Sequence, residues 1–230
     1  MIPHRTITLL LLIMFAFTFS NCTNERRDAR QPEPDQPAIL IAYFSWADNT
    51  VIENPDLADI DAMTSASLIA PGNTGQLARM IQDAIGGDLF PILVAEPYSS
   101  DFTECVNRVR EELTATSYPA LKTNINNIDD YDIVFLGYPV WANTCPMAIF
   151  SFIEKNDLSG KTILIFSAFG SGSMEKSVND IAAALPDSSI LIKNTFGAPR
   201  SNFASAQENI KVWLAELDID FKSQRRNCCL

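Results

Sequence analysis

Two stretches near the start of the chain pair asparagine with threonine beside a turn: residues 43–50, YFSWADNT, and residues 72–78, GNTGQLA. Proteins hold a phosphate with backbone N–H groups and hydroxyls at a helix N-terminus, where the helix dipole also favours an anion. The second stretch fits this chemistry, because Gly72 permits a tight turn and Thr74 opens an amphipathic segment. The first fits poorly, because Pro55 and several acidic residues follow it.

We therefore predict one phosphate loop that is divided by an insertion over residues 46–70. The loop begins at Ser45 and ends with Gly72, Asn73, Thr74 and Gly75. The insertion is acidic, which suits either a partner-facing lid or a solvated surface loop. Taken alone, GNTG is equally compatible with a simple turn and helix cap.

Two further loops follow apolar runs and suit a planar aromatic ligand. Residues 137–146, GYPVWANTCP, contain Trp141, whose indole can stack on such a ligand while backbone amides bind its edge. Residues 166–173, FSAFGSGS, hold two glycines that allow close backbone approach. Each loop also has a purely structural interpretation, in which Trp141 packs against the core and the Gly-Ser run is a connector.

Five apolar runs rich in β-branched and aromatic residues alternate with five segments of helical period. The runs cover residues 39–45, 89–94, 133–138, 162–167 and 189–192, and the helical segments cover residues 76–85, 102–113, 147–153, 174–185 and 206–217. This alternation indicates a parallel sheet covered on both faces. We predict an α/β fold with a three-layer, doubly wound, five-stranded parallel sheet of strand order 2-1-3-4-5. Its ligands would lie at the carboxyl ends of the strands, just after Ser45, Tyr138 and Ser167.

Composition excludes several classes of function. The 230 residues are 47% hydrophobic and carry a formal net charge of −11, so the chain can bury one sizeable core but repels nucleic acid. The only histidine, His4, lies in the N-terminal leader. The folded domain therefore has no imidazole for a Ser-His or Cys-His pair or for a typical zinc site, and we predict no metal site.

The N-terminus resembles a bacterial lipoprotein signal. An apolar run at residues 7–19 ends just before Cys22, where such a signal has the cysteine that becomes lipidated. A plain cleaved signal and an uncleaved anchor are the alternatives. The predicted organisation is a signal peptide (1–21), a disordered tether (22–37), a folded domain (38–218) and a flexible tail (219–230). The tail ends in Cys228 and Cys229, either an oxidation-prone pair or part of an idle segment.

The order of these motifs resembles the flavodoxin-like family, and in particular a bacterial subgroup in which YFSW is followed, after an insertion, by GNT and a helix. The resemblance includes residues 96–98, EPY, residues 131–146, YDIVFLGYPVWANTCP, and residues 158–173, LSGKTILIFSAFGSGS. With the helix around Trp213 it covers nearly all of residues 39–217. Several ordered motifs over a whole domain make the resemblance specific.

This resemblance implies one noncovalent FMN, with its phosphate in the divided loop and its isoalloxazine between the other two loops. The implied cofactor-binding residues are Ser45, Trp46, Gly72, Asn73, Thr74, Gly75, Pro139, Val140, Trp141, Ala142, Asn143, Ser167, Phe169, Gly170 and Gly172, with Trp141 stacking on the flavin. Two segments depart from the family pattern. Ala47 and Asp48 replace the usual glycine, which brings a carboxylate to the phosphate unless the insertion carries it away. Residues 167–169, SAF, replace a segment like Thr-His-Glu, which removes polar groups beside the flavin.

The expected function is electron transfer or simple quinone or flavin reduction, because FMN supplies the redox chemistry and no catalytic side chain is predicted. The leader implies export to the bacterial cell envelope with a lipid anchor at Cys22. The expected partners are therefore a redox protein or a membrane quinone. The alternative is a flavin-free ligand-binding or interaction domain on the same scaffold, since a fold alone does not guarantee a function.

Overall fold

The computed structural model describes residues 37–52, 68–170 and 172–221, all within the compact unit Pro32–Leu230. The predicted signal peptide, Cys22, nearly all of the tether, most of the insertion, and Cys228 and Cys229 lie outside the described residues. Within the described residues, none of the helices has the length and apolar character needed to span a membrane. The same part of the chain holds no cluster of three or more histidine, cysteine, aspartate or glutamate side chains that could bind a metal ion.

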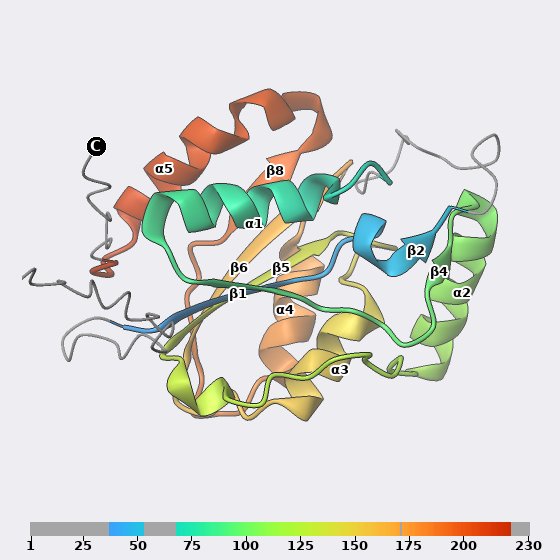
Figure 1. The fold of residues 1–230 in the computed structure, drawn as a ribbon, viewed down its shortest axis with the longest axis horizontal. Coiled ribbons are helices and arrows are strands. Elements are labelled where there is room, and N and C mark those ends of the chain that lie inside the picture. The colour runs from blue at the N-terminus through green and yellow to red at the C-terminus, as the bar shows by residue number, and fades with distance from the viewer. Residues whose placement is uncertain (1–36, 53–67, 171, 222–230) are drawn as a thin grey trace, which may run out of the picture. The chain divides into compact units, whose positions relative to one another are not determined.

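A parallel sheet forms the centre of the domain (Figure 1). Its strands are β1 (Ile39–Tyr43), β3 (Asp88–Pro91), β5 (Ile133–Pro139), β6 (Thr162–Phe169), β7 (Ile190–Leu191) and β8 (Phe196–Pro199). The order is β3-β1-β5-β6-β7, and β8 also pairs with β6. This order confirms the predicted α/β fold and its 2-1-3-4-5 arrangement. β1 and β5 are buried along their whole length, as expected of apolar strands covered on both faces.

Helices cover both faces of this sheet and complete the three predicted layers. They are α1 (Gly72–Ile85), α2 (Phe102–Ala115), α3 (Met147–Lys155), α4 (Glu175–Ala184) and α5 (Ala206–Glu216). Figure 1 shows α1 and α5 on one face and α3 and α4 on the other. Successive side chains of β1 alternate between the two cores: Leu40 and Ala42 pack on the side of α2, α3 and α4, and Ile41 and Tyr43 pack under α1 and α5.

Two features of the strands were not predicted. β7 pairs with β6 at Thr162 and Ile163, whereas β8 pairs with its other end, so the fifth strand position is shared. The sequence of β8, FGAP, contains the glycine and proline that strands usually avoid, which explains why it was missed. A separate two-stranded sheet joins β2 (Thr50–Val51) to β4 (Tyr98–Ser99).

Asn49 connects the end of β1 to the segment after β3. Its buried side chain donates to the carbonyl oxygens of Ser45 at 2.9 Å and Ile92 at 3.0 Å, and its amide oxygen accepts from the Val94 N–H at 2.7 Å. These three bonds fix the short 3-10 helix Ala47–Asn49, which directly follows Trp46. Asn49, the asparagine of the first asparagine–threonine pair, therefore has a structural role.

The folded part of the chain reaches beyond the predicted domain boundary at residue 218. Ile219 and Phe221 pack against the core under α1 and α5, and the ring centroid of Phe221 lies 5.9 Å from that of Phe135. These two apolar residues thus belong to the domain, and the rest of the predicted tail lies outside the described residues.

Candidate functional site

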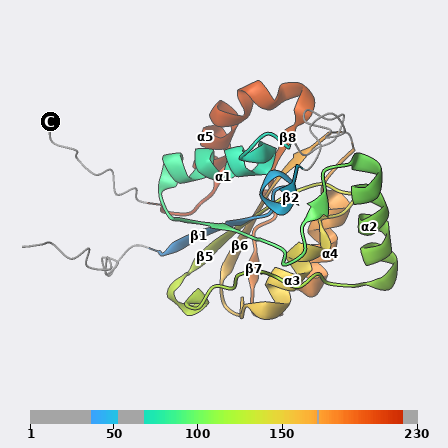
Figure 2. The same cartoon turned by 45° about the vertical axis from the view of Figure 1, so that its right-hand side comes forward.

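The three predicted loops leave the sheet at one edge, because β1, β5 and β6 are parallel neighbours. Tyr43 pairs with Gly137, which pairs in turn with Phe166, and β5 ends at the buried Pro139. The amino end of α1 lies beside the 3-10 helix Ala47–Asn49, as Figure 1 and the turned view in Figure 2 both show. The structure therefore brings the two halves of the predicted phosphate loop together.

GNTG forms the first turn of α1, because this helix begins at Gly72 and not at the predicted residue 76. Gly72 has a φ of 71°, a left-handed value that favours glycine. A Cβ at Gly75 would lie 3.0 Å from the Pro71 Cβ and 3.3 Å from the Tyr43 ring, so a larger residue would crowd this turn. The first N–H groups of a helix lack intrahelical acceptors, and here they belong to the GNTG turn.

Ser45 is buried after β1 and is hydrogen-bonded to Asp48. Its hydroxyl donates to Asp48 Oδ2 at 2.7 Å, and Ser45 Oγ in turn accepts from the Asp48 N–H at 3.1 Å. The insertion therefore does not carry Asp48 away from the predicted phosphate loop. A cavity of about 600 Å³ lies at the amino end of α1, and its lining residues are Asp48, Ala70, Pro71, Gln76 and Arg79.

The loop after β5 closes a tight turn. The N–H groups of Trp141 and Thr144 each donate to the other residue's carbonyl oxygen at 2.8 Å. Ala142 and Asn143 form the exposed tip, with φ values of 46° and 66°. The Val140 N–H donates at 3.0 Å to a carbonyl oxygen of β6, which fixes this loop against the next strand. The exposed peptide groups of the tip are available to the edge of a ligand.

Trp141 and Trp46 pack inside an aromatic cluster. Trp141 is only 9% exposed; its ring centroid lies 5.3 Å from those of Phe44 and Tyr98 and 6.1 Å from that of Trp46, all in edge-to-face geometry. Trp46 is 1% exposed, and its indole N–H donates to the Ser99 carbonyl oxygen at 3.2 Å. Trp141 thus packs against the core, which was the alternative interpretation of this residue. Stacking of Trp141 on a flavin stays a prediction.

The loop after β6 begins with a serine whose hydroxyl already has a partner. Ser167 is fully buried, and its Oγ donates to the Tyr138 carbonyl oxygen at 2.7 Å. Accessible surface begins further along: Phe169 and Gly170 are half-buried, and Gly172 is exposed with a φ of 91°. Ser167 therefore ties β6 to β5, and the glycines offer the surface that a ligand can reach.

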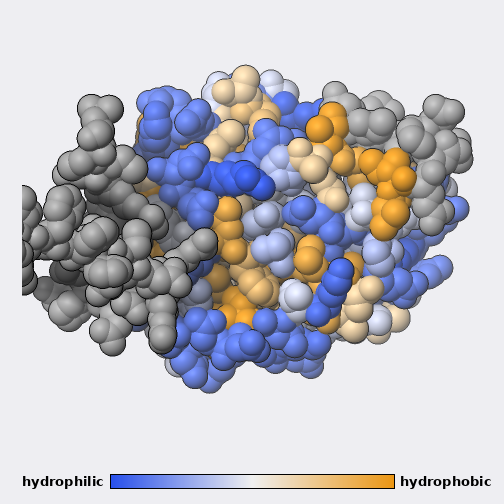
Figure 3. All heavy atoms as spheres, viewed as in Figure 1, coloured by the Kyte–Doolittle hydropathy of each residue, from blue (hydrophilic) through white to orange (hydrophobic). Residues whose placement is uncertain are grey.

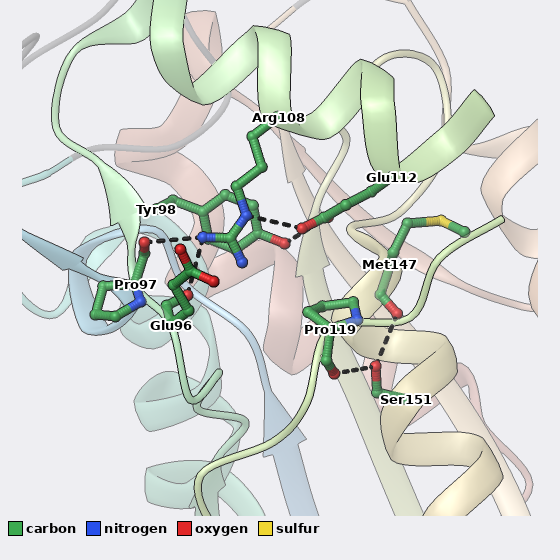
Figure 4. Close-up of polar contacts among 8 residues, drawn as sticks. All are labelled: Glu96, Pro97, Tyr98, Arg108, Glu112, Pro119, Met147 and Ser151. Carbon is green, nitrogen blue, oxygen red and sulfur yellow. Dashed lines mark hydrogen bonds and ion pairs between the residues drawn. The ribbon is translucent and has the colours of Figure 1, made fainter. Parts of the chain in front are cut away.

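A polar network that the sequence did not predict supports the aromatic cluster from α2 (Figure 4). Arg108 Nη1 donates to the two carbonyl oxygens of residues 96–97 at 2.9 and 2.8 Å, and its Nε donates to Glu112 Oε1 at 2.9 Å. Glu112 Oε2 accepts from the Tyr98 phenol at 2.8 Å, and the Arg108 guanidinium lies 4.0 Å from the centre of the Tyr98 ring. Because Tyr98 packs on Trp141, this network holds one side of the cluster.

The two cysteines of the described residues are buried and free. Burial raises the pKa of the Cys105 thiol to about 12, and burial also raises the pKa of the Cys145 thiol. Both groups are therefore protonated at neutral pH, and neither supplies a thiolate nucleophile.

Residues 59–217 of the chain match the family model described as flavodoxin. The chain belongs to the flavodoxin family. The first three solved structures in the comparison support the same fold. A protein from Bacteroides eggerthii, classed by inference as a flavoprotein, is 29% identical over 80% of this chain and 99% of that chain, with a TM-score of 0.56. No curated protein matched the sequence.

Two further solved structures are similar to this chain in fold. A protein from Bacteroides uniformis, also classed by inference as a flavoprotein, is 22% identical over 79% of this chain and 99% of that chain, with a TM-score of 0.55. A flavoprotein in complex with FMN from Lactobacillus acidophilus is 17% identical over 75% of this chain and 97% of that chain, with a TM-score of 0.50. The family resemblance drawn from the sequence motifs is thus confirmed for this flavodoxin, apart from the insertion and the leader.

Proposed function

We propose that this flavodoxin binds one noncovalent FMN and uses it in electron transfer or in simple quinone or flavin reduction. The observation that carries the proposal is the meeting, at the carboxyl edge of a flavodoxin sheet, of Ser45, the GNTG turn and the loops after β5 and β6. The Lactobacillus structure with bound FMN supports this choice of ligand.

The donors at the amino end of α1 fit the phosphate of FMN. They are the hydroxyls of Ser45 and Thr74, both buried in the protein, and the backbone N–H groups of the first turn. A side chain at Gly75 would crowd Pro71 and Tyr43, so glycine lets the turn pack closely against the end of β1. These groups would orient the ligand through hydrogen bonds and the helix dipole.

The other two loops fit the flavin ring. The exposed turn at Ala142 and Asn143 offers peptide groups to the ring edge, and the glycines after Phe169 permit close approach from the other side. Trp141 supports the turn from within the core. The residues present therefore suit a planar ring held by backbone groups, with an aromatic cluster beneath it.

When bound, FMN supplies the redox chemistry, and the protein sets its potential and access. The net charge of −11 disfavours additional negative charge on the ligand, which lowers its reduction potential. With its thiols protonated and its only histidine at residue 4, the domain has few groups for proton transfer, which favours electron transfer over hydrolytic chemistry.

Titration of the purified full-length protein with FMN tests this function. We expect a stoichiometric complex with a visible flavin band, and about tenfold weaker FMN binding by Thr74→Val, because one hydrogen bond to the phosphate is lost. Thr123→Val, which removes the same group at an exposed position far from the site in sequence, is the control and should bind like the unmodified protein. A protein that has no flavin band after the unbound FMN is removed would contradict the proposal and favour the flavin-free alternative.

We also propose that the protein is exported and lipid-anchored at Cys22, and that its partner is a redox protein or a membrane quinone. The apolar run at residues 7–19 and the position of Cys22 support this proposal. A tether would confine the domain near a membrane-bound partner and raise the local concentration of that partner.

Cell fractionation and mass analysis of the mature N-terminus test the anchor. We expect a membrane-associated protein with an acylated Cys22, and loss of both properties in Cys22→Ser, because only the thiol accepts the lipid. Cys105→Ser changes a buried cysteine of the domain instead and should leave the anchor intact. Recovery of the mature protein in the cytosol without an acyl group on Cys22 would overturn the proposal.

A further inference from the structure

The hydroxyl of Ser45 has a single proton, and in this structure it donates that proton in a hydrogen bond to Asp48. Ser45 Oγ donates to Asp48 Oδ2 at 2.7 Å, and the Asp48 N–H closes the ring by donating to Ser45 Oγ at 3.1 Å. A hydroxyl has one donor, so a phosphate can bind that donor only if the carboxylate gives it up. The side chain of Asp48 thus competes with a phosphate for one of the groups proposed to bind it.

The backbone around Asp48 keeps the carboxylate near the site. Asp48 is the middle residue of the 3-10 helix Ala47–Asn49, and the buried side chain of Asn49 fixes that helix through three hydrogen bonds. Asp48 itself is exposed, so its side chain can turn away without unfolding the site. Its charge, however, stays close to the amino end of α1.

The other titratable groups at this position are the Arg79 guanidinium and the phenol of Tyr43. Asp48 and Arg79 line the same cavity of about 600 Å³, and among the described residues no ion pair joins them. Burial raises the pKa of the Tyr43 phenol. The charge of Asp48 raises this pKa further and the charge of Arg79 lowers it, so both charges act on the Tyr43 hydroxyl. Arg79 can therefore receive the carboxylate, or the phosphate, when either moves into the cavity.

We propose that Asp48 determines ligand preference at this site: it competes with the flavin phosphate for Ser45 and repels that phosphate, which weakens FMN binding relative to riboflavin. The inference rests on the proposed function, because it concerns the same flavin site. Riboflavin has the same ring but no phosphate, so Asp48 weakens the binding of FMN and not that of riboflavin. The protein would hold FMN less tightly than the same loop with a neutral residue at position 48.

Binding of FMN and of riboflavin to full-length protein, measured for the unmodified chain and for Asp48→Asn, tests the inference. Asparagine keeps the size and the acceptor oxygen of aspartate but removes its charge. We expect about tenfold tighter FMN binding by Asp48→Asn and a change of less than about twofold for riboflavin. Because salt screens exposed charges, the gain for FMN should shrink at high ionic strength. Asp83→Asn, an equal charge change at an exposed position of α1, is the control and should alter neither affinity.

Ser45→Ala supplies a second test, because a general effect of charge on FMN binding would not produce the result expected for it. Because Asp48 occupies the Ser45 hydroxyl, this substitution should weaken FMN binding more in an Asp48→Ala background, where position 48 has no acceptor oxygen, than in the unmodified protein. If the ratio of FMN affinity to riboflavin affinity is the same in the unmodified protein and in Asp48→Asn, the inference is wrong. It is also wrong if Asp83→Asn increases the affinity for FMN as much as Asp48→Asn does. Either result leaves the proposed function standing. If neither flavin binds to any variant, the proposed function fails, and the inference fails with it.

Discussion

Replacing Gly137 by alanine is expected to lower the free energy of unfolding by about 3 kcal/mol, because the new methyl group has no space. A Cβ at this position would lie 2.1, 2.3 and 2.7 Å from three ring atoms of Phe166. Phe166 is fully buried and lies directly across the β5–β6 register from Gly137. Close-packed interiors transmit such an overlap to the strands, so the ring cannot simply move aside.

Urea unfolding followed by circular dichroism measures this effect. Gly160→Ala is the matched control: its φ is 73° but nothing lies within 4 Å of the added Cβ, so only backbone strain of about 1 kcal/mol is expected. Gly137→Ala combined with Phe166→Leu should be more stable than the sum of the two separate changes predicts, because leucine vacates the overlapping space. If Gly137→Ala costs no more than Gly160→Ala, the packing of Phe166 over β5 is wrong.

The sheet could be predicted from the sequence because each central strand is a short, continuous apolar run. Residues 133–138 and 162–167 have no polar face, so they had to be buried on both sides in neighbouring positions. β8 could not be predicted in the same way, because its hydrogen bonds to β6 come from tertiary pairing and not from local sequence preference. The start of α1 was also misjudged, because glycines at 72 and 75 have weak helix propensity and a specific packing role.

The location of the candidate site could be predicted, but its side-chain geometry could not. Loops after parallel strands meet at one edge wherever the strands are adjacent, so Ser45, Trp141 and Ser167 were expected together. Whether each side chain faces a ligand depends on partners distant in sequence. Ser167 is paired with the Tyr138 carbonyl oxygen 29 residues away, and Trp141 packs on rings that lie far from it in the chain. No periodic pattern records such contacts.

The Arg108 network illustrates which signals are local and which are not. Arg108 and Glu112 are four residues apart on a helix that the sequence predicted, so their pairing was accessible to prediction. The Tyr98 phenol that shares Glu112 lies 14 residues away, across a turn and a short strand. The carbonyl groups of residues 96–97 could not be identified from sequence either, because backbone acceptors have no sequence signature.

Replacing Arg108 by methionine should lower the free energy of unfolding by about 2 kcal/mol and loosen the aromatic cluster. Methionine keeps the apolar stem but leaves the Glu112 carboxylate, whose side chain is 11% exposed, without its cation. The Arg108 side chain is itself 24% exposed, so solvent reduces the cost below that of a fully buried pair. Because Tyr98 is held by the same network, tryptophan fluorescence should shift to longer wavelength as the cluster around Trp141 admits water.

Denaturant titration of three variants separates this network from an ordinary surface ion pair. Lys211→Met removes the cation of an exposed pair with Glu208 at 3.1 Å and should change stability by less than about 0.5 kcal/mol. Adding Glu112→Gln to Arg108→Met should recover part of the loss, because a neutral amide still accepts from the Tyr98 phenol but needs no cation. Equal stabilities of Arg108→Met and Lys211→Met would mean that Arg108 does not hold Tyr98 against Trp141, and that the aromatic cluster is supported by ring packing alone.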